Sequence, residues 1–480
     1  MKRLKPLLCL FALALTGCAV GPDYVSPGVP VNAQGAFTAG EAPALYDQGP
    51  AHDDWWRLYR DPILDRLIED ALAANIDVRV AVARLERARA MLRDAGADRY
   101  PGTEFDATAS RQRQAAVQAL PGQDRQHTLV DAGFGIAYEI DLFGRVRRGV
   151  ESARGDFEAA QADRDAVKVA IVADTTRAYL NAAGAAQRLA VAQRIVSLLD
   201  RSLRVMNGRE RAGMATSLDT ARIAALREQR HSSIPVIAAE RQAALFRLAV
   251  LTGRAPGELP ADAADLNAAA DLNALPALDM PIPVGDGQSM LARRPDVRAA
   301  ERRLAAATAR IGVATADLYP RISFGASIGS TGFGAGDFFG AGPLRWLAGP
   351  SISWSFPNQE RIRARISAAQ ADSAGALATF DGSVLQALAE TETALSNYAR
   401  AVDQRTALAA AREQADRAAR IVRAQQREGR SDSLALLDAE RTFADAQAQV
   451  ADAEERIANT QVDLFRALGG GWASEPLRTM

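Results

Sequence analysis

Four stretches of the chain alternate between apolar residues and small or polar ones, the period of two expected of β-strands. In residues 322–329 every even position is apolar and every odd position is small or polar, and residues 105–110, 130–141 and 351–356 alternate similarly. Aromatic residues lie near the ends of these stretches, at Tyr138, Trp346 and Trp354. A half-buried strand of a soluble protein has the same period. Lengths of about 10 residues, a face of small residues and terminal aromatics favour outer-membrane strands, so we predict four membrane-spanning strands.

The segments between these strands have few Gly and Pro residues and carry apolar residues at helical spacing. Pro235 should kink its helix or force a local adjustment. At 1.5 Å per residue, the longest predicted helices would reach about 95 and 105 Å, lengths typical of coiled coils. The predicted helices cover a segment opened by Trp55 and Pro62 and ending near Asp98, and residues 144–207, 213–253, 286–317, 358–427 and 431–467.

The two halves of the chain repeat one another at an offset of about 219 residues. Asp77-Val78-Arg79 recurs as residues 296–298, and Tyr100-Pro101 recurs as Tyr319-Pro320. Each copy contains a helix, a β-hairpin and a long helical hairpin, so the duplication fixes the architecture. The predicted divisions are a signal peptide (1–17), a lipidated tether (18–53), a first repeat (54–275), a second repeat (276–472) and a C-terminal tail (473–480).

The N-terminus predicts export and lipid attachment. A basic start and a short apolar run precede Leu15-Thr16-Gly17-Cys18, which resembles the lipobox of bacterial lipoproteins. In such segments the cysteine is acylated and becomes the new N-terminus, and several acyl chains together anchor a protein stably. Because Ala19 rather than aspartate follows Cys18, the resemblance implies delivery to the outer membrane. The alternative is an ordinary signal peptide with an incidental cysteine.

The composition points away from metal and thiol chemistry. Cys9 would leave with the signal peptide and Cys18 would be acylated, so the mature chain would have no free thiol. The three histidines (His52, His127 and His231) lack the spacing of metal ligands. We therefore expect no metal site and no cofactor.

Charge and motifs likewise exclude several functions. The formal net charge is −1, without a basic region for nucleic acid. Residues 325–329 match the G-x-S-x-G pattern of hydrolases, but that motif needs a strand-to-helix turn, and here it lies within a predicted strand. We therefore expect no catalytic residues and no enzyme activity. No apolar run after Cys18 is long enough for a transmembrane helix.

The number of predicted strands requires oligomerisation. Open sheet edges are not tolerated in lipid, and the smallest single-chain barrels have about eight strands. Several subunits must therefore contribute two hairpins each to one barrel. The strand count alone allows a dimer, a trimer or a tetramer.

Motifs along the whole mature chain resemble those of the lipoprotein outer-membrane factors of tripartite efflux systems (the NodT, or TolC/OprM-like, family). They are Cys18-Ala19-Val20-Gly21-Pro22-Asp23-Tyr24, Trp55-Trp56 with Asp61-Pro62, residues 138–144 (YEIDLFG) and Arg294-Pro295-Asp296-Val297. The resemblance implies an α+β membrane protein: a homotrimer with a shared 12-stranded barrel and a long periplasmic α-helical barrel. It also implies a channel for drugs or other small molecules, a periplasmic adaptor protein, and an inner-membrane pump of the resistance–nodulation–division class.

The resemblance also implies a gate at the far helix tips. Leu434 and Asp438 fall where OprM-like members have an apolar ring and an acidic ring, and their spacing of four places them on one helical face. We expect Leu434 to close the pore and Asp438 to favour cations. Gly213, Gly429 and Arg430 would form tips that an adaptor contacts. The simpler interpretations are a solvated helix face and plain chain reversals.

One departure concerns residue 426, where some TolC-like proteins have an aromatic residue and this chain has Gln426. Any lock that depends on that ring is in doubt here. Two other functions remain possible from the sequence: a type I protein-secretion conduit and a purely structural envelope lipoprotein.

Overall fold

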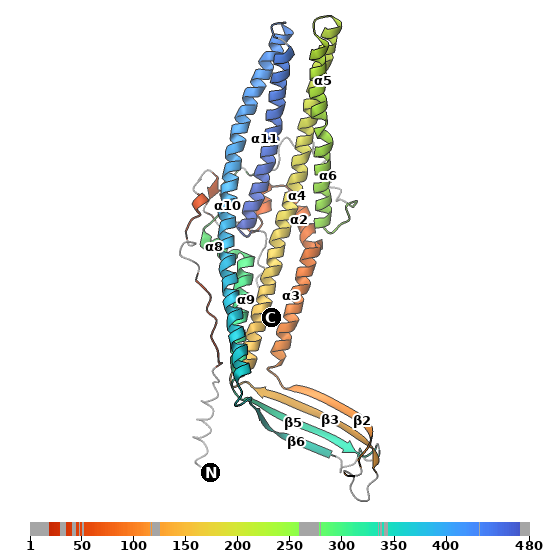
Figure 1. Ribbon diagram of the computed structural model, residues 1–480, viewed down its shortest axis with the longest axis vertical. Helices are drawn as coiled ribbons and strands as arrows, with labels where there is room; N and C mark the ends of the chain where they lie inside the picture. Colours follow the sequence, from red (N-terminus) through yellow and green to blue (C-terminus); the bar gives the residue numbers. More distant parts are fainter. Residues whose placement is uncertain are drawn as a thin grey trace. The chain divides into compact units, whose positions relative to one another are not determined.

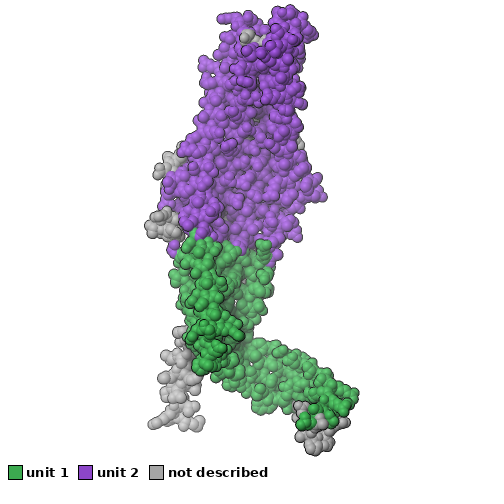
Figure 2. Space-filling view, in the orientation of Figure 1, with its two compact units in different colours: residues 1–27, 84–161, 299–381 green, residues 28–83, 162–298, 382–480 purple. Residues whose placement is uncertain are grey.

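The structure is a computed structural model that describes residues 19–28, 35–40, 45–47, 49, 52–115, 117, 125–258, 278, 280–334, 336, 338–339, 344–431 and 433–470. The predicted signal peptide and Cys18 lie outside this range. The chain divides into two compact units (Figure 2): unit 1 contains residues 1–27, 84–161 and 299–381, and unit 2 contains residues 28–83, 162–298 and 382–480. Each unit contains residues from both sequence repeats.

Unit 1 contains a four-stranded antiparallel sheet in the order β2-β3-β5-β6 (Figure 1). Its strands are β2 (Gly102–Arg113), β3 (Gln126–Ile140), β5 (Arg321–Gly332) and β6 (Leu344–Ser353). The two predicted hairpins are present. Strands β3 and β5 also pair, from Val130 opposite Gly332 to Ile140 opposite Ile322, so the two repeats share one sheet. Local alternation carried no signal for that pairing.

The pairing register gives the sheet one apolar face. Phe134 lies opposite Phe105 on one side and Ile328 on the other, and Ile328 lies opposite Trp346. Because side chains alternate along a strand, the intervening residues face the other way, and they are small or polar except for Leu129 and Leu347. The side chains of the apolar face, Phe105, Phe134, Ile328 and Trp346, are all exposed in the isolated chain, from 42% for Phe134 to 75% for Trp346.

The prediction for the last strand, residues 351–356, was placed too far along the chain, because β6 begins at Leu344 and overlaps the predicted stretch only at residues 351–353. Strand β6 ends at Ser353, and Trp354 and Phe356 follow it. Trp354 Nε1 donates a hydrogen bond of 3.0 Å to the carbonyl oxygen of Leu318, which holds this segment beside the turn before β5. The alternation therefore continues beyond the last ladder hydrogen bond.

The segment that follows Cys18 belongs to unit 1 and packs where β3 leads into α4. The Val20 amide donates to the Phe143 carbonyl (3.1 Å), and Arg148 Nη2 donates to Asp23 (2.6 Å). Gly144 has a φ of 82°, and a Cβ there would lie 2.6 Å from the Cβ of Ala19. A glycine is thus required both for the turn into the helix and for the close approach of the chain.

Nine α-helices lie among the described residues. They are α2 (Pro62–Ala74), α3 (Ile76–Ala97), α4 (Arg145–Arg211), α5 (Ser217–His231), α6 (Ser233–Leu251), α8 (Gly287–Arg293), α9 (Pro295–Ala316), α10 (Glu360–Arg427) and α11 (Ser433–Ala467). The 67 residues of α4 and the 68 of α10 confirm the two very long helices. Within this part of the chain, no helix combines the length and apolar character needed to cross a membrane.

Three predicted helices are divided in the structure. The segment from Trp55 to Asp98 contains a 3₁₀ turn (Trp55–Tyr59) and helices α2 and α3, separated at Asn75. Helices α8 and α9 are separated at Arg294, which precedes a proline. Ser232 separates α5 from α6, as expected near Pro235, which has no N–H to donate to the preceding turn.

The core of unit 2 combines both repeats. Ile195 and Leu199 of α4, Leu226 of α5 and Ala444 of α11 form one buried cluster. Trp55 is fully buried and stacks on Phe465 of α11, with ring centroids 4.7 Å apart. A short parallel pair, β1 (Tyr46–Asp47) with β4 (Ile282–Pro283), joins the predicted tether to the second repeat and was not predicted from the sequence.

Candidate functional site

The turn at the first helix tip begins with a left-handed glycine. Gly213 has a φ of 70°; its amide donates to the Glu210 carbonyl (2.9 Å), and the next amide donates to the Arg209 carbonyl (2.8 Å). This double hydrogen bond is the Schellman arrangement that ends an α-helix. Thr216 then caps α5 by exchanging hydrogen bonds with Asp219.

The second tip repeats this geometry. Gly429 has a φ of 72°, its amide donates to the Gln426 carbonyl (3.1 Å), and the Arg430 amide donates to the Gln425 carbonyl (2.8 Å). Both glycines therefore adopt a left-handed conformation where a long helix ends. Nothing lies within 4 Å of a Cβ built on either glycine, so these turns are open to solvent in the isolated chain.

Helix α11 presents two different faces near this tip. Leu434 is 53% exposed, and Asp438, one turn later, is exposed with Arg441 as its ion-pair partner at 3.1 Å. Leu436 and Glu440 occupy the buried face. Leu434 and Asp438 thus lie on one exposed side of the helix, as their spacing predicted.

An ion pair that the sequence did not reveal fixes this helix against α10. Arg423 donates two hydrogen bonds to Glu440, at 2.5 and 2.6 Å, and lies over the ring of Phe443. The Glu440 side chain is only 7% exposed. Hydrogen bonding to Glu440 raises the pKa of Arg423, so the guanidinium group stays charged. The tie orients the exposed face of α11 that carries Leu434 and Asp438.

A hydrogen bond connects the two helix tips of unit 2. Arg209, in the last turn of α4, donates a hydrogen bond of 2.8 Å to the backbone carbonyl of Gln426 near the end of α10. Gln426 is buried, whereas Leu218, the counterpart of Leu434 at the first tip, is 57% exposed.

Cys18, the predicted lipidation site, lies outside the described residues.

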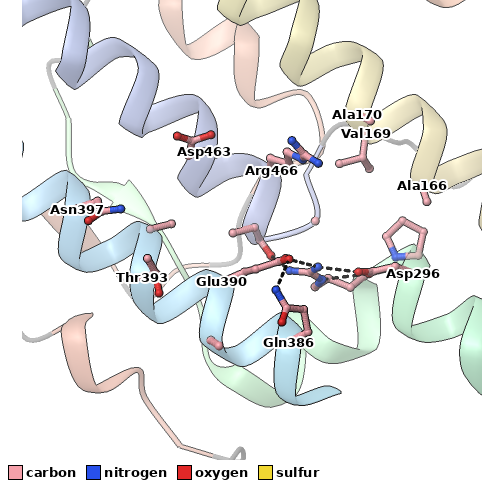
Figure 3. Close-up of a pocket in the computed structure, with 16 residues that line it drawn as sticks. Ala166, Val169, Ala170, Asp296, Gln386, Glu390, Thr393, Asn397, Asp463 and Arg466 are labelled. Atoms are coloured by element: carbon pink, nitrogen blue, oxygen red, sulfur yellow. Dashed lines mark hydrogen bonds and ion pairs between the residues drawn. The ribbon is translucent and has the colours of Figure 1, made fainter. Parts of the chain in front are cut away.

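A charged pocket of about 640 Å³ lies elsewhere in unit 2, between α4, α10 and α11 (Figure 3). Arg294 is buried at its base and donates to Asp296 (2.6 Å), Glu390 (2.7 Å) and the Ala467 carbonyl (2.9 Å). Burial opposes ionisation of both carboxyl groups, but it is outweighed at Asp296 by the hydrogen bond and charge of Arg294, and at Glu390 by hydrogen bonds from Gln386 and Arg294, so both pKa values are lowered. The Arg-Pro-Asp-Val motif thus joins the start of α9 to α10 and to the end of α11.

The first repeat makes the equivalent connection without charge. Asn75, at the matching break, donates to the Leu251 carbonyl (2.9 Å) at the end of α6. A glycine closes each repeat: a Cβ on Gly253 would contact the backbone of Ala74, and one on Gly469 would contact Arg294. The two repeats therefore close by the same backbone geometry and differ in their polar side chains.

A further acidic cluster surrounds Arg188 in unit 2. Arg188 bridges Glu240 (2.9 Å) and Glu455 (2.8 Å), with Asp452 at 3.9 Å. Burial raises the pKa of Glu455, and the charge of Arg188 only partly offsets it. Glu455 lies against Gly184, where a Cβ would come within 3.0 Å of its side chain. Among the described residues, no group of three or more His, Cys, Asp or Glu has the arrangement of a metal site.

Comparisons with known proteins agree with this architecture. The model of the "Outer membrane efflux protein" family matches residues 67–254 and 287–470. The chain is 32% identical to outer membrane protein OprJ of Pseudomonas aeruginosa, over 96% of this chain and 95% of that protein. It is also 32% identical to the pyoverdine export outer membrane protein OpmQ of Pseudomonas putida, over 98% and 99% of the two chains.

A solved structure of the outer-membrane channel OprN superposes with a TM-score of 0.87. The identity is 37%, over 95% of this chain and all of that one. Both halves of the duplication thus lie within the matched regions, and the fold and sequence agree along nearly the whole length. The chain belongs to the outer membrane efflux protein family.

Proposed function

We propose that the protein forms a homotrimeric channel in the outer membrane, in which three four-stranded sheets close one 12-stranded barrel. The observation that carries this proposal is the register of the sheet, which gathers most of its large apolar side chains on one face. An exposed apolar face of this size needs lipid or protein to cover it. The opposite face, with its glycines, serines and charges, suits a water-filled lumen.

The edges of the sheet support oligomerisation. Strands β2 and β6 are the outer strands of the sheet, and each has a partner on one side only. In lipid such edges must be paired, because no water is present to satisfy the backbone groups. Pairing β2 of one subunit with β6 of the next satisfies both edges and leaves all subunits equivalent.

The channel serves tripartite efflux. In this role it receives drugs or other small molecules from a periplasmic adaptor and an inner-membrane pump of the resistance–nodulation–division class. The turns at Gly213 and Gly429, with Arg430, are the surfaces we assign to the adaptor, because they are exposed and rigidly capped. Relatives are named for different cargoes, pyoverdine for OpmQ and toluene for TtgI. The cargo is therefore set by the pump, and the conduit itself is not an enzyme.

Acylation of Cys18 completes this assignment. The residues that follow it are held against Phe143 and Arg148, where β3 leads into α4. The lipid would thus attach beside the end of the sheet that joins the helices. Mass spectrometry of the mature N-terminal peptide should show an acylated cysteine, and Cys18→Ser should remove both the acyl mass and the processing step.

Leu434 and Asp438 form the proposed gate. Both side chains project from the exposed face of α11, and symmetry would bring one copy of each per subunit to the pore axis. A ring of leucines closes the pore to solutes, while a ring of carboxylates attracts cations and repels anions.

Planar-bilayer recordings of the full-length protein test the gate. Asp438→Asn should reduce cation preference, and Leu434→Ser should increase the leak current several-fold. Leu218→Ser is the matched control, since Leu218 is the equally exposed counterpart at the other tip. If Leu218→Ser leaks as much as Leu434→Ser, or if Asp438→Asn keeps the wild-type selectivity, the gate lies elsewhere.

A further inference from the structure

The apolar face of the sheet has a measurable height. Along β3 it runs from Ile140, which pairs with Ile322, to Val130, which pairs with Ala109 and Gly332. At about 3.4 Å per residue these rows span about 34 Å along the strand. For strands tilted by about 40°, this corresponds to roughly 26 Å along the membrane normal, close to the apolar band of about 25 Å in outer-membrane barrels.

Two arginines continue the same face beyond this band. Arg111 and Arg113 follow Ala109 at intervals of two residues in β2, so they share its face, and they lie opposite Thr128 and Gln126. Both are exposed. They occupy the end of the sheet away from the junctions with α3 and α4, because those junctions lie at the opposite ends of β2 and β3.

Arginines on the two faces of the sheet differ in whether they have an acidic partner. On the polar face, Arg345 is neutralised by Asp131 (2.6 Å) and also donates to Thr331 (3.0 Å). Arg111 and Arg113 have no carboxylate partner among the residues that the structure describes, and the residues paired with them on β3 are uncharged. Two cations at the edge of an apolar band therefore lack a counter-charge within the described sheet.

We propose that Arg111 and Arg113 bind a phosphate group of a glycolipid in the outer leaflet of the membrane. This inference rests on the proposed membrane orientation of the sheet. The recognised chemistry is a phosphate at headgroup depth: guanidinium groups bind phosphate oxygens through paired, charge-assisted hydrogen bonds. The acyl chains of the same lipid would cover the exposed apolar rows below, which include Phe105 and Phe134. The assembled channel would carry one such site per subunit.

Native mass spectrometry of the full-length protein in detergent tests the site, with bisphosphorylated lipid A as the probe. Wild type should retain lipid A, and Arg111→Gln/Arg113→Gln should bind it at least about tenfold more weakly, since two charge-assisted contacts are lost. Arg111→Lys/Arg113→Lys should restore most of the binding. Arg412→Gln/Arg417→Gln, which removes the same charge from exposed positions on α10, is the matched control and should bind as wild type does.

Three results would overturn the proposal: equal lipid A binding by the glutamine variant, equal binding of lipid A stripped of its phosphates, or displacement of the lipid by micromolar inorganic phosphate. The last would identify a site for free phosphate. Channel conductance of the same samples separates this inference from the proposed function. Wild type without conductance would contradict the channel, whereas intact conductance with unchanged lipid binding would contradict the phosphate site alone.

Discussion

Arg294 illustrates how a single side chain can organise several helices. It is nearly buried, neutralises Asp296 and Glu390, and binds a carbonyl that the end of α11 leaves free. A cation at a helix C-terminus is also favoured by the helix dipole. The sequence motif pointed to the family, whereas the structure supplies the physical reason for the arginine.

Replacing Arg294 by methionine should destabilise the protein by about 2 kcal/mol at neutral pH, since two carboxylates lose their partner while remaining partly solvated. The lowered pKa values of Asp296 and Glu390 mean that their contribution is present above their unfolded pKa values and is lost as pH falls through the folded ones. Thermal unfolding of both proteins should therefore converge below about pH 4. A difference that is constant with pH would contradict the ionic role.

Glu455 should behave in the opposite way. Burial raises its folded pKa, so the ionised carboxylate costs stability above that pKa, and this cost disappears as pH falls. Glu455→Gln should therefore unfold at a higher temperature than wild type at pH 7, and this advantage should shrink toward pH 5. Glu413→Gln, which removes a carboxylate from an exposed position on α10, is the matched control. A destabilised Glu455→Gln protein at pH 7 would mean that the Arg188 ion pair outweighs burial.

The residues found from the sequence were those with a local signature. Gly213 and Gly429 lie where long helical segments end, and their left-handed backbone conformation is one that glycine adopts readily. Arg423 and Glu440 lie on different helices on either side of a turn, and neither differs in local pattern from its many charged neighbours. Leu434 and Asp438 lie on one exposed face as their spacing predicted, but their role as a gate stays a prediction.

At the scale of elements, the period of the strands and the length of the long helices were predicted correctly, and the break near Pro235 was expected, whereas the breaks at Asn75 and Arg294 were missed. The four strands and the two very long helices follow from alternation and from the lack of Gly and Pro. The break at Asn75 depends on a side chain that binds the end of a distant helix, whereas the break at Arg294 has a local signal, the proline that follows it, which the interpretation of the sequence did not use. The β3–β5 pairing depends on how the two repeats meet, which hairpin-level reasoning does not address.

The two faces of β5 should differ sharply in their tolerance of charge. Ile328→Arg places a cation on the apolar face and should cost about 2–4 kcal/mol in the membrane-inserted state. Ser327→Arg, one residue earlier on the polar face, should be tolerated. The amount of folded protein in outer-membrane fractions, measured by its resistance to heat and detergent in gels, compares the two variants. Equal loss from both would contradict the assignment of faces.

At the scale of the molecule, the duplication predicts four strands per chain, and this number of strands led to the prediction that the protein is an oligomer. The compact units divide the chain differently from the repeats, because each contains parts of both copies. The sequence therefore predicted the internal symmetry, whereas the packing that mixes the copies depends on contacts between distant segments, such as Trp55 on Phe465.

Engineered cysteines should detect the contact between subunits. The only native cysteines are Cys9 and Cys18, which are expected to be removed and acylated, so the background is low. Thr108→Cys in β2 combined with a cysteine at Leu347, Gly349 or Ser351 in β6 should give covalent trimers for at least one pair. Each single variant is the control and should remain monomeric in denaturing gels. Covalent dimers alone, across all three pairs, would contradict ring closure by these edges.

The outer strands β2 and β6 differ from one another, and this difference allows uncontrolled polymerisation. Contacts between two different surfaces add subunits head to tail, and such growth ends in a ring only when the rotation closes; otherwise it continues as a filament. Each newly exported chain would therefore be a polymerisable unit. Pro350 in β6 lacks an N–H donor, and prolines on outer strands discourage indiscriminate edge pairing. In the proposed channel, the curvature of the sheet would therefore set the subunit number, and membrane insertion would have to outpace linear growth.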